Sequence, residues 1–254
     1  MDALVMAGGK ASPEFTGATG ATNRALVEIA PGRTMLDFVV DALSEAKSIG
    51  RLFVVGDIPQ NDNYTVIAPG ESLMDNLVIG IKAMGHQAGN RVLLVSSDIP
   101  FITGEAVDDF VANADQLGAG FCYPIIPMDA YNRHFAGMKR TTLRLREGEF
   151  TGGNVILVDP SFLLQNEAAV RGAYAARKSV LKLGSLLGWG LLLRIVLSQT
   201  IASNLLCVAD LEAGVGRLLG GAAARAIVTE YASLGTDVDK VEDVEIARKM
   251  LTQR

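Results

Sequence analysis

Residues 91–100 read RVLLVSSDIP, and this stretch indicates how the rest of the chain is organised. Val92–Ser96 is mostly apolar and rich in valine and leucine, which is typical of a strand buried on both faces. Directly after this strand come Ser97, the lone carboxylate of Asp98, and Pro100. Because open α/β sheets bind their ligands at the carboxyl ends of parallel strands, Asp98 is a candidate functional residue.

Segments on either side of this stretch alternate between strand and helix patterns. Short apolar runs predict strands, whereas apolar residues at helical spacing predict helices. The predicted strands before residue 117 are Asp2–Ala7, Arg51–Gly56, Tyr64–Ala68 and Arg91–Ser96, and the predicted helices are Thr34–Ala46, Leu73–Met84 and one that Thr103 caps. This alternation predicts an α/β fold with a mostly parallel central sheet and flanking helices.

The rest of the chain adds strands and a largely helical part. We expect strands at Gly118–Ile126, Val155–Val158 and Arg225–Glu230, and a C-terminal helix at Val241–Leu251. Residues 161–219 have mostly helical patterns. Because there is no linker and no internal repeat, we predict a single domain over residues 1–254 with a helical insertion near the C-terminus at 161–219.

Composition limits the class of protein. The chain has 254 residues, 49% of them apolar, and a net charge of −5, which favours a compact globular enzyme and gives no sign of nucleic-acid binding. Two histidines leave little material for a histidine metal site or catalytic triad. Cys122 and Cys207 lie in apolar surroundings, typical of buried thiols in a reducing compartment.

One apolar segment, Leu181–Leu197, resembles a membrane-spanning helix in composition. Leu181–Leu197 is interrupted by Lys182, Arg194 and glycines, so its apolar run is too short to span a bilayer. We expect a buried helix or a contact in a homo-oligomer there. The sequence thus predicts a soluble cytoplasmic protein without membrane contact.

A glycine pair follows the first predicted strand. Gly8 and Gly9 let the backbone approach a ligand and point N–H groups at it, and Lys10 adds a cation. Residues 11–23 are rich in Gly, Ala, Ser and Thr, which predicts a long flexible loop closed by Arg24. An ordinary strand-to-helix turn is the alternative. No Walker A pattern occurs, which argues against a P-loop ATPase.

A second carboxylate, Asp239, also follows a strand-like segment, so Asp98 and Asp239 are expected to meet at one edge of the sheet. Two carboxylates with phosphate oxygens and waters are a common site for Mg²⁺. In this interpretation Lys10 and Arg24 bind the β- and γ-phosphates of a nucleoside triphosphate. The alternatives are that Asp98 caps a helix, and that Asp239 or its neighbour Asp237 caps the last helix or pairs with Lys240.

A basic segment is the candidate acceptor site. Residues 133–146 carry five cations and no acid, which suits a phosphate-rich ligand: Arg133, Lys139, Arg140, Arg144 and Arg146. Charges placed along an edge strand to prevent pairing are the alternative. We predict that the accepting substrate is held by Arg140, Thr141, Gly153, Asn154 and Lys178.

Four segments, in this order, resemble the nucleotidyltransferase family. They are VMAGGK at 5–10, NRALVEIAPGRTMLDFVVDAL at 23–43, SSDIP at 96–100 and DVDKVEDVEIAR at 237–248. The family includes the molybdopterin guanylyltransferase-like (MobA-like) proteins and the sugar-phosphate and methylerythritol-phosphate nucleotidyltransferases. The resemblance covers essentially the whole chain and implies a Rossmann-like domain of the GT-A type.

The resemblance also implies roles for particular residues. Asp98 and Asp239 are the expected Mg²⁺ ligands, and Lys10, Arg24 and Asp98 the expected catalytic residues. The expected nucleotide-binding residues are Ala7, Gly8, Gly9, Lys10, Asn76 and Gly80. Ser12-Pro13 stands where the family's loop usually carries an arginine, and Arg24 where it carries a lysine.

The expected function is that of a Mg²⁺-dependent nucleotidyltransferase. It moves an NMP from an NTP to a phosphorylated small-molecule acceptor and releases pyrophosphate. A glycosyltransferase that uses a nucleotide-sugar is one alternative, although Asp98-Ile99-Pro100 lacks the second acid of an Asp-x-Asp motif. The other is a non-catalytic nucleotide-binding or regulatory protein, which the missing loop arginine favours.

Overall fold

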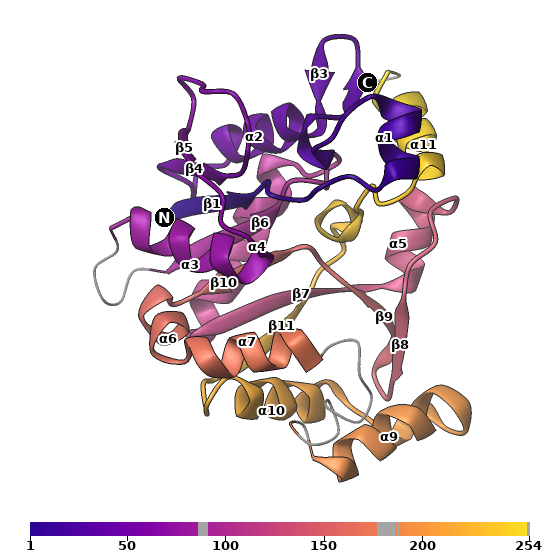
Figure 1. Ribbon diagram of the computed structural model, residues 1–254. Coiled ribbons are helices and arrows are strands. Elements are labelled where there is room, and N and C mark those ends of the chain that lie inside the picture. The colour runs from indigo at the N-terminus through magenta and orange to yellow at the C-terminus, as the bar shows by residue number, and fades with distance from the viewer. Residues whose placement is uncertain (86–90, 177–185, 187, 253–254) are drawn as a thin grey trace.

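The computed structural model describes the chain except for residues 86–90, 177–185, 187 and 253–254. A central sheet, with helices on both faces, organises the described part (Figure 1). Its strands are β1 (Asp2–Met6), β4 (Leu52–Val55), β5 (Thr65–Ile67), β6 (Val92–Ser96), β7 (Phe121–Pro127), β8 (Thr142–Leu145), β9 (Gly148–Gly152), β10 (Val155–Val158) and β11 (Ala224–Val228). Two further strands, β2 (Glu28–Ala30) and β3 (Arg33–Thr34), form a separate hairpin.

The strand order confirms the predicted mostly parallel sheet. Within the described residues the order is β5-β4-β1-β6-β10-β7-β9-β8, with β11 beside β7. Neighbours from β5 to β6 pair in parallel, as do β7 and β11. Strand β10 is antiparallel to both β6 and β7, so β6 and β7 run in the same direction. The carboxyl ends of β1, β4 and β6 therefore meet at one edge.

Most of the helices lie where the apolar spacing predicts them, whereas α1 (Pro13–Thr19) and α5 (Met128–Phe135) are not predicted from the sequence. The others are α2 (Met35–Glu45), α3 (Leu73–Ala83), α4 (Gly104–Leu117), α6 (Pro160–Gln165), α7 (Glu167–Ala176), α9 (Trp189–Thr200), α10 (Val208–Leu218) and α11 (Val241–Leu251). Thr103 caps α4 as expected, because its hydroxyl accepts from the backbone N–H of Ala106 at 3.2 Å.

Both faces of β1 and β6 are covered, which explains their unbroken apolar runs. Successive side chains of a strand point to opposite faces. Val5 accordingly packs in the cluster formed with α2 and α4, whereas Leu4 packs in the cluster formed with α3. Val95 and Leu94 divide in the same way. Burial on both sides is what the sequence of β6 predicts.

The prediction of a flexible loop over residues 11–23 is wrong, because α1 occupies its middle. Ser12 caps this helix by accepting from the backbone N–H of Phe15, and Pro13 stands at its beginning. Gly20, with φ at 77°, closes it. Among its residues only Phe15 is buried, so a helix this short shows no apolar period.

The described part of residues 161–219 is helical, as predicted. Helix α9 keeps Trp189, Leu193 and Val196 largely exposed, at 59%, 58% and 48%. No described helix is long and apolar enough to cross a bilayer. The single domain and the homo-oligomer stay predictions. Of the two free thiols Cys122 is buried, whereas Cys207 is partly exposed and differs in this from the expectation.

Candidate functional site

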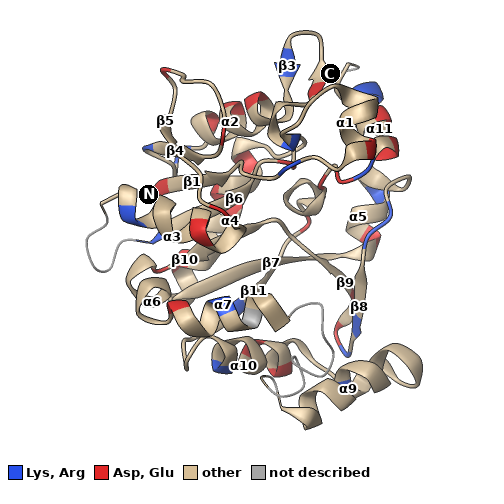
Figure 2. Cartoon of the chain, in the orientation of Figure 1, with Lys and Arg blue, Asp and Glu red and all other residues tan. Residues whose placement is uncertain are grey.

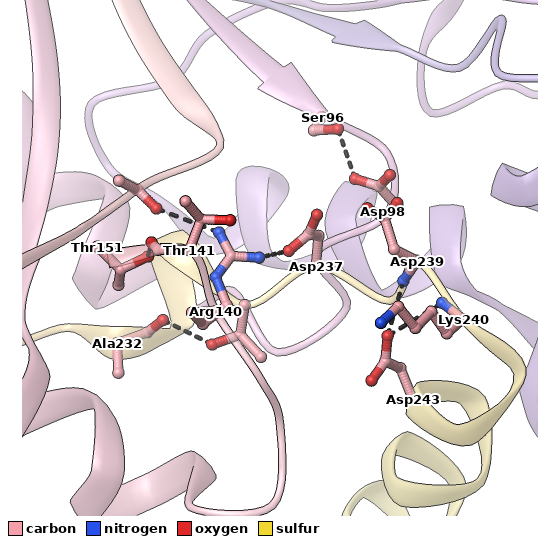
Figure 3. Close-up of polar contacts among 12 residues, drawn as sticks. Ser96, Asp98, Arg140, Thr141, Thr151, Ala232, Asp237, Asp239, Lys240 and Asp243 are labelled. Carbon is pink, nitrogen blue, oxygen red and sulfur yellow. Dashed lines mark hydrogen bonds and ion pairs between the residues drawn. The ribbon is translucent and has the colours of Figure 1, made fainter. Parts of the chain in front are cut away.

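Asp98 lies where the sequence places it, directly beyond β6 at the carboxyl edge of the sheet. The residue is buried, and the hydroxyl of Ser96 donates a hydrogen bond to its carboxylate (Figure 3). Burial raises the pKa of Asp98, while the hydrogen bond from Ser96 and the positive charge of Arg24 oppose that rise. Because Thr103 is the cap of α4, Asp98 is not a helix cap.

Asp239 reaches the same place along an unexpected path. It does not follow a strand, because β11 ends at Val228 and a 3₁₀ helix, Ala232–Gly235, comes between them. The backbone N–H of Val238 donates to the carbonyl of Asp98 at 2.8 Å and so fixes the segment against the end of β6. This backbone hydrogen bond brings Asp239 close to Asp98. The expectation that both residues follow the ends of strands is therefore wrong for Asp239.

Helix α11 uses a different acid at its beginning. The carboxylate of Asp243 accepts from the backbone N–H groups of Asp239 at 3.2 Å and Lys240 at 3.0 Å. The side chain of Asp239 is thereby left for another partner. Sequence reasoning missed Asp243, although an acid three residues after the N-cap residue, here Lys240, is a capping signal.

Arg24 connects the two carboxylates. One end of its guanidinium lies 3.4 Å from the carboxylate of Asp98, and the other forms an ion pair with Asp239. Arg24 begins a 3₁₀ helix, Arg24–Leu26, that the side chain of Asn23 caps. Asn23 also donates to the carbonyl of Ala7 at 2.8 Å, so Arg24 is anchored to the end of β1.

A cavity of about 820 Å³ lies beside these residues, between the loop after β1, helix α1 and the beginning of α3. Its lining includes Gly8, Gly9, Lys10 and Asn76, four of the residues predicted to bind a nucleotide. The side-chain oxygen of Asn76 accepts from the backbone N–H of Gly70 at 2.7 Å, which fixes its amide. The structure therefore brings the glycine loop and Asn76 to one hollow.

Two predicted nucleotide-binding residues lie elsewhere. The N–H of Ala7 donates to the carbonyl of Val55 at 2.8 Å, and Asn23 uses its carbonyl. Gly80 packs against β1, since a Cβ there would lie 2.5 Å from Leu4 Cδ2. Ala7 and Gly80 therefore belong to the packed interior and do not line the cavity.

Asp239 lines a second cavity, of about 650 Å³. Arg140 and Thr141, two of the residues predicted to hold the acceptor, line it. Its other charged lining residues are the cations Lys139 and Lys240 and the acids Asp237, Asp239, Glu242 and Asp243. In Figure 3, Asp237 points toward Arg140. The two form a largely buried ion pair, with 17% and 15% of their side chains exposed, so Asp237 neither caps α11 nor pairs with Lys240.

Gly153 and Asn154, also predicted to hold the acceptor, do not line this cavity. Gly153 is packed against Pro124, where a Cβ would lie 2.5 Å from Pro124 Cγ. Asn154 lies next to β6, because its carbonyl accepts from the N–H of Ser96 at 3.0 Å. Its buried side-chain nitrogen has no hydrogen-bond partner among the described residues. Lys178 lies outside the described residues.

The basic segment does not form one cluster. Figure 2 shows its cations spread over α5, the connection after it and β8. Arg133 belongs to α5 and pairs with Glu230, whereas Arg144 lies on β8, at the end of the sheet. Only Lys139 and Arg140 face the second cavity. Charges that prevent pairing at an edge strand therefore explain Arg144 and Arg146. Binding of a phosphate-rich ligand remains the interpretation for Lys139 and Arg140.

The Arg140–Asp237 pair gives a prediction about stability. We expect Asp237→Asn to lower the free energy of unfolding by about 2–4 kcal/mol, because it leaves a mostly buried guanidinium without its counter-charge. Urea denaturation measures this change. The matched control is Asp41→Asn, which breaks the exposed pair with Arg33 and should cost less than about 1 kcal/mol. Equal losses in the two variants would show that burial of the first pair has no consequence.

Comparison with known proteins agrees with this geometry. A family model described as the MobA-like NTP transferase domain matches residues 3–186. A solved structure from Thermus thermophilus, described as a hypothetical transferase, is 37% identical, with a TM-score of 0.82 and coverage of 96% of this chain and 98% of that one. No curated protein matches the chain.

More distant solved structures have the same fold. The 2-C-methyl-D-erythritol 4-phosphate cytidylyltransferase of Thermus thermophilus is 14% identical, with a TM-score of 0.56 and coverage of 99% and 98%. A CMP:2-keto-3-deoxy-manno-octonic acid synthetase solved with CTP is 14% identical, with a TM-score of 0.59 and coverage of 100% and 99%. The family match, over more than half of the chain, confirms the resemblance: the chain belongs to the MobA-like NTP transferase family and is a nucleotidyltransferase.

Proposed function

We propose that the protein is a Mg²⁺-dependent enzyme that moves an NMP from an NTP to a phosphorylated small molecule and releases pyrophosphate. One observation carries the proposal. Asp98 and Asp239 share Arg24 as a partner. Asp239 lines the second cavity, and Asn23, the residue before Arg24, lines the glycine-lined cavity. A nucleotide in the first cavity and an acceptor in the second would meet at these carboxylates.

The two carboxylates fit a magnesium ion. No group of three or more Asp, Glu, His or Cys side chains suited to a metal occurs among the described residues. Mg²⁺ is nevertheless commonly bound by one or two carboxylates, with substrate phosphates and waters as its other ligands. Asp98 and Asp239 both reach the guanidinium of Arg24, so their oxygens point toward a common place. The metal would supply charge neutralisation at the phosphates during an in-line displacement.

Residues of the chain would bind the phosphates, the base and the acceptor. The backbone of Gly8 and Gly9 would hold the phosphates, and Lys10, which is exposed in the cavity, would stabilise the leaving pyrophosphate. The fixed amide of Asn76 would face the base. In the second cavity Lys139 and Lys240 remain exposed cations for the acceptor's phosphate, because Asp237 already neutralises Arg140.

Release of pyrophosphate tests the proposal. The four NTPs are supplied with Mg²⁺ and with pools of sugar phosphates and cofactor precursors, and Asp98→Ala serves as the inactive control. We expect at least one combination to release pyrophosphate from the wild type and none from the variant. Nucleotide binding without release above the variant would contradict the enzymatic proposal for those acceptors.

The same experiment separates the two alternatives. A binding or regulatory protein is favoured by α1, which occupies the loop and has Ser12-Pro13 where the family usually carries an arginine. Such a protein would bind NTP and release no pyrophosphate. A glycosyltransferase would release a nucleotide from a nucleotide-sugar, but Pro100 stands where an Asp-x-Asp motif that begins at Asp98 would have its second acid.

A further inference from the structure

Arg24 occupies the place where the proposed metal ligands converge. Its guanidinium contacts Asp98 at 3.4 Å and is paired with Asp239, so in this structure both carboxylates already have a cation. The backbone of Arg24 is fixed: its N–H donates to the carbonyl of Gly9 at 3.1 Å, and Asn23 anchors the turn to the end of β1. About 30% of the side chain is exposed, so an incoming ligand can reach the guanidinium.

The same side chain passes next to the phosphate-binding loop. A Cβ added to Gly9 would lie 3.6 Å from Arg24 Nε and 3.7 Å from a terminal nitrogen. Gly9 also lines the nucleotide cavity. A phosphate bound to this loop would therefore be within reach of the guanidinium. Arg24 could then pair either with the two carboxylates or with the phosphates.

The balance of charge at this site determines which ligands can displace the guanidinium. Two carboxylates carry a charge of −2, and Arg24 reduces it to −1. A divalent cation that arrives alone meets a partly neutralised site and repels a guanidinium that would lose both partners. When phosphates arrive with the metal, the guanidinium can exchange the carboxylates for phosphate oxygens and keep a charged hydrogen bond.

We infer that Arg24 links the binding of metal and phosphate: it blocks the metal site while the nucleotide cavity is empty and moves to the phosphates when they bind. Metal and polyphosphate then bind cooperatively. By linkage, each raises the affinity of the other by the same factor. The inference rests on the metal site of the proposed function, and it adds the reason why that site would stay empty without a nucleotide.

Direct metal titration tests this coupling without any catalytic turnover. Free Mn²⁺ is followed by electron paramagnetic resonance while it is added to the wild type, Arg24→Gln, Arg24→Lys and Arg33→Gln. In the absence of phosphates we expect Arg24→Gln to bind Mn²⁺ about tenfold more tightly than the wild type, because the competing charge is gone. Arg24→Lys keeps the charge and should stay near the wild type. Arg33→Gln, which removes an exposed pair with Asp41, should change nothing.

Tripolyphosphate, which carries no base, tests the contact between Arg24 and the phosphates. By calorimetry in the presence of a metal chelator, we expect Arg24→Gln to bind it about tenfold more weakly than the wild type. The inference is overturned if Arg24→Gln binds Mn²⁺ no more tightly than the wild type, or if neither protein binds Mn²⁺. Tighter Mn²⁺ binding in Arg24→Gln, together with an absence of pyrophosphate release from the wild type, would leave the coupling intact and reject the catalytic proposal.

Discussion

Asp98→Asn is expected to reduce metal-dependent nucleotide binding by at least about a hundredfold, because a neutral amide cannot replace a carboxylate that binds Mg²⁺. The substitution keeps the size of the side chain and the possible hydrogen bond with Ser96, so the end of β6 should retain its structure. Binding of each of the four NTPs, measured by calorimetry with and without Mg²⁺, gives the effect. The loss should be confined to the titration that contains metal.

The control for Asp98→Asn is Asp237→Asn. Asp237 is a carboxylate of the same segment as Asp239, but its partner is Arg140 and not Arg24. We expect Asp237→Asn to change metal-dependent nucleotide binding by less than about threefold at a temperature where the protein is folded. Equal nucleotide affinity in the wild type and both variants would contradict the two-carboxylate site.

Gly8→Ala is expected to weaken nucleotide binding by about 10- to 100-fold whether or not metal is present. A Cβ at this position would lie 2.1 Å from Asn76 Nδ2, which is far inside van der Waals contact. Asn76 is buried and its other amide atom is held by Gly70, so it cannot move away without losing that hydrogen bond. The displaced side chain would also obstruct the cavity that both residues line.

Gly172→Ala is the matched control for this steric effect. A Cβ at Gly172, in the middle of α7, meets no atom within 4 Å. Nucleotide affinity should therefore equal that of the wild type. A thermal melt of both variants separates loss of the cavity from loss of the fold. If Gly8→Ala binds nucleotide as the wild type does, the cavity between the glycine loop and α3 is not the nucleotide site.

The sequence predicts the parallel half of the sheet well because burial on both faces leaves an unmistakable composition. Strands β1 and β6 have unbroken apolar runs for this reason, and Asp98 stands out as the first acid after such a run. The position of Asp98 then follows from a general property of α/β sheets. The four family-like segments supplied the rest of the prediction.

Other features depend on contacts that leave no local pattern. The path to Asp239 depends on one backbone hydrogen bond, from Val238 to Asp98, between residues far apart in the chain. Strand β10 has the composition of a buried strand, but its antiparallel direction is not encoded in that composition. The division of the basic segment between α5, the second cavity and β8 likewise depends on where the chain turns.

The shared position of Asp98 and Asp239 is the central claim, and a double-mutant cycle tests it most directly. NTP binding in the presence of Mn²⁺ is measured for Asp98→Asn, Asp239→Asn and the variant with both substitutions. If both carboxylates hold one ion, either single substitution already removes most of the metal's contribution to NTP binding. The NTP affinity of the double variant should then be close to that of the single variant with the lower affinity. Losses that add fully in free energy, or Mn²⁺-dependent binding that survives in the double variant, would contradict a single metal site at this edge of the sheet.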